Sequence, residues 1–244
     1  MTYSILPLQV GTIRVQKSTL TFMRGFGEQL NVPILMWIVR DADHTYVVDT
    51  GAHKSVLGID ESARRWQAAH EAPQLALASA GVDANAVEMV IVTHLHYDHA
   101  GNCDLFPNAE LVVQRRELEY ARNPLPPHRR VYDSPALALP DDRWHLVDGS
   151  VEIRPGIRLL LTPGHTPGLQ AVVVETAGGR TIIASDTIPL YENWGTTNDR
   201  EQWIPSGSFI DLQEYYLTLD RIAAVGGQVL PGHDPAVLGE QWPR

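Results

Sequence analysis

The chain has 244 residues, of which 44% are hydrophobic, a size and composition that fit one globular α/β domain over residues 1–244. Its formal net charge of −10 argues against a nucleic-acid partner, because such binding depends on basic patches that release counterions. Its single cysteine excludes an internal disulfide, the N-terminus lacks a signal-like apolar run, and no segment reaches the roughly 18 apolar residues of a membrane span. We therefore expect a cytoplasmic protein that binds no membrane.

Apolar and β-branched residues predict strands in the N-terminal part of the chain. Residues 5–10 and 12–15 predict a strand or hairpin, and residues 33–40 with 45–49 predict a second hairpin. The stretch 18–31 between them is apolar but contains two glycines. We expect it to be a surface loop half-buried against the sheet, and the alternative is a wall or lid over a substrate site.

Helices are predicted in three later segments. Residues 62–70 and 74–80 have helical character and end at Gly81, a residue suited to the left-handed end of a helix. Residues 114–122 predict another helix, and residues 123–140, with five prolines, predict an irregular excursion near the active-site mouth.

The last predicted helix begins at Asp211. The sequence Asp211-Leu-Gln-Glu214 has the form of a capping box, in which the first carboxylate accepts from free amides of the first turn. One apolar stripe follows, and we expect it to face the core. The stripe consists of Leu212, Tyr215, Tyr216, Leu219 and Ile222.

A hexapeptide rich in histidine follows a segment that predicts a buried strand. Residues 87–93 are apolar and β-branched, and the chain continues as His94-Leu-His96-Tyr-Asp98-His99. Because His94 and His96 alternate, an extended backbone would direct both side chains to one side. Asp98 and His99 continue round the turn, where a role in binding metal or orienting water is expected of Asp98.

Three further predicted strands are each followed by one potential metal ligand. They are residues 157–162 before His165, residues 181–185 before Asp186, and residues 228–230 before His233. Ligands gather beyond the carboxyl ends of the strands in an open sheet, so these side chains are expected to converge.

Together these segments supply five imidazoles and two carboxylates, a donor set that suits zinc, manganese or iron(II). A structural zinc site rich in thiolates is excluded, because Cys103 is the only cysteine. Two metal ions roughly 3.5–4 Å apart can share and acidify one hydroxide. A shared carboxylate is the natural bridge between them, and Asp186 is the candidate.

This ordered set of residues resembles that of the metallo-β-lactamase superfamily, from about residue 33 to residue 235. The resemblance implies a four-layer αβ/βα sandwich of two mixed sheets with outer helices. It also implies that Asp49 supports the ligand side chains without itself binding the metal. The implied ligands are His94, His96 and His165 for one metal and Asp98, His99 and His233 for the other, with Asp186 bridging.

Within the superfamily, the chain most resembles the N-acyl-homoserine lactone lactonases. The shared features are its size, residues 94–101 and the segment 186–193. Members commonly carry Tyr-x-Tyr-Glu-Asn after the bridging aspartate, and the first tyrosine hydrogen-bonds the lactone. Here Pro189 occupies that position and only the second tyrosine, Tyr191, is present. Either Tyr191 substitutes, or metal alone stabilises the oxyanion, or the substrate is not a homoserine lactone.

The resemblance implies a quorum-quenching hydrolase that opens a lactone ring through a metal-bridging hydroxide, with Asp98 passing the proton and Tyr191 assisting. It implies two divalent ions, zinc first with manganese, iron or cobalt as alternatives, and a small-molecule substrate. A monomer and a homodimer are both open. The alternatives are a hydrolase of another lactone, a cyclic amide or imide, or a thioester, and an inactive metal-binding scaffold.

Overall fold

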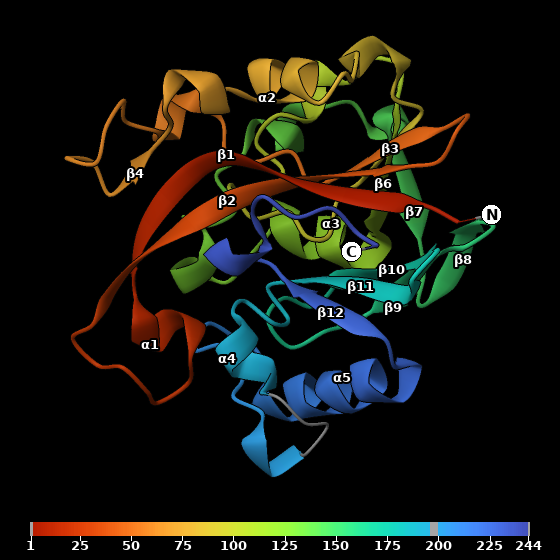
Figure 1. The fold of residues 1–244 in the computed structure, drawn as a ribbon. Coiled ribbons are helices and arrows are strands. Elements are labelled where there is room, and N and C mark those ends of the chain that lie inside the picture. The colour runs from red at the N-terminus through yellow and green to blue at the C-terminus, as the bar shows by residue number, and fades with distance from the viewer. Residues whose placement is uncertain (1, 196–199, 244) are drawn as a thin grey trace.

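Two β-sheets lie face to face in the computed structural model, which describes residues 2–195 and 200–243 (Figure 1). In spatial order, the seven-stranded sheet consists of β4 (Arg65–Trp66), β1 (Ser4–Gln16), β2 (Gln29–Arg40), β3 (Thr45–Val48), β5 (Met89–Ile91), β6 (Glu110–Gln114) and β7 (Trp144–Val147). The five-stranded sheet consists of β12 (Gln228–Pro231), β11 (Gly179–Ser185), β10 (Gln170–Thr176), β9 (Ile157–Leu161) and β8 (Val151–Arg154).

Both sheets are mixed. In the larger sheet β1, β2 and β3 pair antiparallel, whereas β3, β5, β6 and β7 pair parallel. In the smaller sheet only β11 and β12 pair parallel. The helices are α1 (Lys17–Leu20), α2 (Pro73–Ser79), α3 (Arg115–Arg122), α4 (Tyr191–Trp194) and α5 (Leu212–Val225). With α2 outside the larger sheet and α5 outside the smaller one, this arrangement confirms the predicted αβ/βα sandwich (Figure 1).

The core follows from the alternation of side chains along the strands. In β2, Leu35 and Trp37 point into the space between the sheets, while Met36 and Ile38 point to the opposite face. The side chains between the sheets form the inter-sheet cluster, which includes Leu35, Trp37, Val48, Ile91, Leu159, Val172 and Ile183. Fully burying each such side chain contributes about 1.5–3 kcal/mol, so this layer holds the two sheets together.

The N-terminal strand is continuous. The predicted segments 5–10 and 12–15 belong to the single strand β1, which pairs with β2 along its length and has a register irregularity between Gln9 and Gly11. The predicted hairpin of residues 33–40 and 45–49 is confirmed as β2 and β3.

The predicted helix at residues 62–70 is wrong. Arg65 and Trp66 instead form β4, which pairs with Ile13 and Thr12 of β1, and only residues 69–71 make a short 3₁₀ turn. The exposed edge of β1 offers this segment backbone partners, and that tertiary pairing outweighs its local helical character.

The other predicted helices are confirmed as α2, α3 and α5. Asp211 caps α5, since its carboxylate accepts a hydrogen bond of 2.9 Å from the Glu214 amide. Tyr215, Leu219 and Ile222 are buried against β10 and β11, as the apolar stripe predicts. None of the helices in the described part of the chain has the length and apolar composition of a membrane span.

Candidate metal centre

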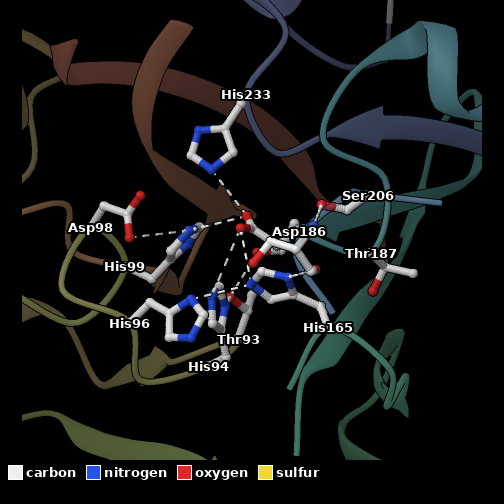
Figure 2. A network of polar contacts seen from close by, with 12 residues as sticks. Thr93, His94, His96, Asp98, His99, His165, Asp186, Thr187, Ser206 and His233 are labelled. Carbon is white, nitrogen blue, oxygen red and sulfur yellow. Dashed lines mark hydrogen bonds and ion pairs between the residues drawn. The ribbon is translucent and has the colours of Figure 1, made fainter. Parts of the chain in front are cut away.

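The seven predicted ligands converge beyond the ends of strands from both sheets (Figure 2). The hexapeptide follows β5 of the larger sheet, and the other three ligands follow β9, β11 and β12 of the smaller sheet. All seven side chains are buried, with exposed fractions of at most 8%. The first group consists of His94, His96, His165 and Asp186, and the second of Asp98, His99 and His233; the donor atoms within each group lie within 4.8 Å of one another.

The carboxylate of Asp186 lies between the two groups. Its Oδ2 is 3.3 Å from His165 Nε2 and 4.0 Å from His94 Nε2. Its Oδ1 is 3.1 Å from His99 Nε2 and 3.0 Å from His233 Nε2. One oxygen therefore faces each group, as a bridging carboxylate requires (Figure 2).

Backbone carbonyls orient two of the histidines. His165 Nδ1 lies 2.7 Å from the carbonyl oxygen of Ser208, and His233 Nδ1 lies 2.9 Å from that of Pro33. A carbonyl oxygen can only accept, so Nδ1 of each ring carries the proton. The lone pair of Nε2 is then directed inward, in the tautomer that binds metal.

Asp49 supports two histidines of the hexapeptide, His99 directly and His94 through Thr93, as the family resemblance implies. Its Oδ2 accepts a hydrogen bond of 2.8 Å from His99 Nδ1, and its two oxygens accept from the amide and hydroxyl of Thr93. The same Thr93 hydroxyl lies 3.2 Å from His94 Nδ1 and 2.9 Å from Ser185 Oγ. One buried carboxylate thus links ligands of both groups.

Two residues beside the ligands adopt left-handed backbone conformations. Asp49 has φ of 57° and Ser185, which precedes Asp186, has φ of 48°. Such conformations cost about 1–3 kcal/mol each and persist only where the surroundings enforce them. Gly232 permits the approach of Ser185, because a Cβ at Gly232 would lie 2.6 Å from the Ser185 carbonyl carbon.

Several buried polar atoms of the centre form no hydrogen bond within the protein. Within the described residues, His94 Nε2, His99 Nε2 and Asp186 Oδ1 make no hydrogen bond. Burying polar atoms without partners is unfavourable unless a ligand satisfies them. The donor set of imidazoles and carboxylates fits two divalent transition-metal ions.

Charges within the cluster shift the pKa values of its members. Burial and the neighbouring His99 hold the pKa of His94 well below its ordinary value, so its imidazole is neutral. Burial opposes ionisation of Asp186, but His233, His99 and His165 outweigh it and hold the carboxyl pKa well below the usual range. Burial likewise opposes a charge on His99, yet Asp186 and Asp49 raise its pKa well above the ordinary value.

Tyr191 and Pro189 lie in the segment after Asp186. Tyr191 is half-buried at the start of α4, where its side chain packs against the inter-sheet cluster and its amide donates to Asp234 Oδ2 at 2.9 Å. The carbonyl of Pro189 accepts a hydrogen bond of 2.8 Å from the His233 amide. Pro189 thus anchors the backbone of a ligand, while the catalytic role of Tyr191 stays a prediction.

The proline-rich segment 123–140 lies against the hexapeptide, as predicted. The Tyr97 amide donates to the Val131 carbonyl at 2.7 Å, and the ring of Tyr132 packs edge-on against that of His96 with centroids 4.8 Å apart. In the segment 18–31, the Phe22 amide donates to the Pro205 carbonyl, whereas Met23 and Phe26 are exposed. Its role as a lid stays a prediction.

Sequence reasoning missed four residues that hold the ligands: Thr93, Glu117, Tyr132 and Ser208. A signal was present for two of them. Thr93 directly precedes His94, and Glu117 lies beside the apolar Leu118 and Ala121 of its helix, where an acid is unexpected.

Comparison with known proteins agrees with this geometry. Residues 31–233 match the model of the Metallo-beta-lactamase superfamily. The N-acyl homoserine lactonase AiiA of Bacillus thuringiensis subsp. kurstaki is 30% identical over 178 residues, which cover 69% of this chain and 69% of that protein. The N-acyl homoserine lactonase AttM of Azorhizobium caulinodans is 26% identical, with 97% of this chain and 93% of that protein covered.

Solved structures extend the likeness to almost the whole fold. A crystal structure of a quorum-quenching N-acyl homoserine lactone hydrolase has a TM-score of 0.83 and 26% identity, covering 97% of this chain and 94% of its own. Another N-acyl homoserine lactone hydrolase, with the product N-hexanoyl-L-homoserine bound at the catalytic metal center, has a TM-score of 0.81 and 25% identity over 97% and 95% of the two chains. With its fold, its buried His/Asp groups and the match over residues 31–233, this chain belongs to the metallo-β-lactamase superfamily.

Proposed function

We propose that this protein is a binuclear metal-dependent hydrolase that opens the lactone ring of N-acyl-homoserine lactones, and so acts in quorum quenching. The observation that carries the proposal is the position of Asp186, with one carboxylate oxygen facing each of two buried ligand groups. The substrate class is supported by the relatives AiiA and AttM, which are N-acyl homoserine lactonases, and by the product-bound structure.

The proposal assigns the ligands by group. His94, His96 and His165 hold one ion, Asp98, His99 and His233 hold the other, and Asp186 contacts both. Zinc is the proposed metal because imidazole nitrogen dominates the donor set, and manganese, iron and cobalt suit the same ligands. The cytoplasm is the proposed location, which agrees with a single, buried thiol at Cys103.

When bound, the two ions supply Lewis acidity that polarises the ester carbonyl and acidifies the attacking water. The protein's part is to move one proton. The Asp98 carboxylate, 8% exposed and 4.0 Å from His99 Nε2, takes a proton from the water whose oxygen bonds to the carbonyl carbon. It then delivers that proton to the ring oxygen as the carbon–oxygen bond breaks. The product is a hydroxy acid, the N-acyl-homoserine.

Tyr191 is the proposed donor to the oxyanion, in place of the tyrosine that Pro189 replaces. Tyr191→Phe is expected to lower kcat by less than the loss of Asp98 does, with little change in KM, because only the transition-state contact is lost. Steady-state kinetics with an N-acyl-homoserine lactone measure both constants. An unchanged kcat would leave oxyanion stabilisation to the metals and remove Tyr191 from the mechanism.

Pro189 favours a second candidate, hydrolysis of another lactone, a cyclic amide or imide, or a thioester at the same centre. A pH-stat panel of zinc- or manganese-loaded protein separates the two candidates. The panel holds short- and long-chain acyl-homoserine lactones, simple γ- and δ-lactones, a cyclic imide, a thioester and a β-lactam. Acid release from the acyl-homoserine lactones, abolished by chelator, is the expected result. Turnover only elsewhere on the panel would reassign the substrate, and no turnover on any member would favour a metal-binding scaffold.

A further inference from the structure

Glu117 is a fully buried carboxylate that joins three separate segments of the chain. It lies on α3, and its Oε1 accepts hydrogen bonds of 3.1 Å from the Leu95 amide and from the Tyr132 hydroxyl. Its Oε2 accepts a hydrogen bond of 3.0 Å from the Gly168 amide. No basic side chain of the described residues forms an ion pair with it.

A buried acid of this kind needs a specific reason. Removing a carboxylate from water is unfavourable, and an apolar residue in the same place would avoid that cost. The three donors offset part of the cost, since hydrogen bonds to a charged acceptor are stronger than neutral ones. Their positions in the chain show what the carboxylate holds in place.

Each donor is adjacent to a ligand of the first group. Leu95 lies between His94 and His96, so its amide fixes the backbone from which both histidines extend. Gly168 lies three positions after His165, in the same loop between β9 and β10. The ring of Tyr132 packs against that of His96, with centroids 4.8 Å apart.

The second group is held by other residues. Asp49 fixes His99, and the Pro33 carbonyl fixes His233. Glu117 makes no contact with either histidine among the interactions of the described residues. Asp49 also reaches His94 of the first group through the Thr93 hydroxyl, whereas the contacts of Glu117 are confined to the first group.

Gly168 makes the close approach of α3 possible. A Cβ at this position would lie 2.4 Å from Glu117 Cβ and 2.5 Å from the Glu117 nitrogen. Gly168, three positions after His165, and the helix that carries Glu117 are thus packed without room for a methyl group between them.

We propose that Glu117 is a positioning residue that fixes His94, His96 and His165 in the geometry that binds the first metal ion, and that it controls the occupancy of this ion alone. The proposal rests on the proposed ligand assignment and not on the identity of the substrate.

The test is cobalt(II) binding to metal-free protein, with chelator competition and the cobalt absorption spectrum as readouts. Glu117→Gln preserves size but places an amide donor opposite at least one of the three donors. We expect one of the two cobalt equivalents to bind roughly tenfold more weakly or worse, the scale seen when a residue behind a metal ligand is changed. The second equivalent should bind as in the wild type.

Two control variants separate positioning from general destabilisation. Glu119→Gln makes the same change at an exposed position on the same helix and should bind both equivalents normally. Leu77→Ala removes buried side-chain volume in α2 and should lower Tm without changing either binding step.

Equal weakening of both equivalents by Glu117→Gln, or normal binding of both, would overturn the proposal. If that variant does not fold, Tyr132→Phe decides, since it deletes one donor and keeps the ring against His96. A smaller weakening of the same single equivalent is expected, and unchanged binding would overturn the proposal. Wild-type protein that binds no cobalt would instead contradict the proposed function itself.

Discussion

At the scale of single residues, the centre depends on which ring nitrogen of each histidine faces inward. For His99, His165 and His233, an acceptor behind the ring holds the Nδ1 proton, so Nε2 is free to bind metal. His96 differs, because its Nδ1 lies 3.2 Å from His165 Nε2 and therefore faces the ligand group. The ligand atoms are thus set by neighbours far away in the sequence.

Asp98 is the residue on which the proposed proton transfer depends. Asp98→Asn is expected to lower kcat at least roughly a hundredfold, because an amide cannot take the proton from water. The measurement is kcat for lactone opening together with the metal content of the same sample. Asp104→Asn, at an exposed position nearby, is the matched control and should keep wild-type kcat. A near-normal kcat for Asp98→Asn at full metal content would exclude Asp98 as the proton carrier.

Cys103 is expected to be chemically inert in the folded protein. Burial raises the pKa of its thiol to about 12, so very little thiolate exists at pH 8. A thiol reagent at pH 8 should therefore leave the native protein unmodified and label one thiol per chain after denaturation. Rapid labelling of the native protein would show that this thiol is accessible.

At the scale of elements, sequence periodicity predicts helices and strands that depend on local residues. It fails for a strand that forms only by pairing with a distant segment. The alternation in β2 and the cap and stripe of α5 are local features, and both are confirmed. Residues 62–70 have local helical character, yet Arg65 and Trp66 form a strand because β1 presents a free edge about fifty residues earlier. The sequence of this segment alone carries no information about the free edge of β1.

The cap of α5 should contribute to stability and not to catalysis. Asp211→Ala removes the acceptor of the Glu214 amide and is expected to lower the free energy of unfolding by about 1 kcal/mol. Urea unfolding measures this change, and Gln213→Ala, exposed on the same turn, is the control. Unchanged stability in Asp211→Ala would mean that solvent replaces the cap at no cost.

At the scale of the whole molecule, the ligands come from both sheets. The larger sheet supplies the hexapeptide after β5, while the smaller sheet supplies His165, Asp186 and His233. A bound metal pair would therefore tie the two layers together at one edge, so metal binding and folding are expected to be coupled.

The distance along the chain between the candidate ligands and the residues that orient them explains how much of the centre the sequence could predict. The candidate ligands could be predicted because they lie in the segments that follow strands and carry metal-binding side chains. Most of the residues that orient these ligands could not be predicted, because they lie far away in the sequence. The contact between His233 and the Pro33 carbonyl, for example, spans 200 positions of the chain. Asp49 was predicted only through the resemblance to a known family.

The dependence of activity on two metal ions is tested most directly by a metal titration of the metal-free protein, in which bound zinc and the opening of an N-acyl-homoserine lactone are followed together. A binuclear lactonase should show no turnover without metal and a turnover that reaches its plateau at two bound ions per chain. His96→Ala should bind less metal and remain far below that plateau. Turnover in the metal-free protein, or none with two ions bound, would contradict a binuclear metal-dependent lactonase.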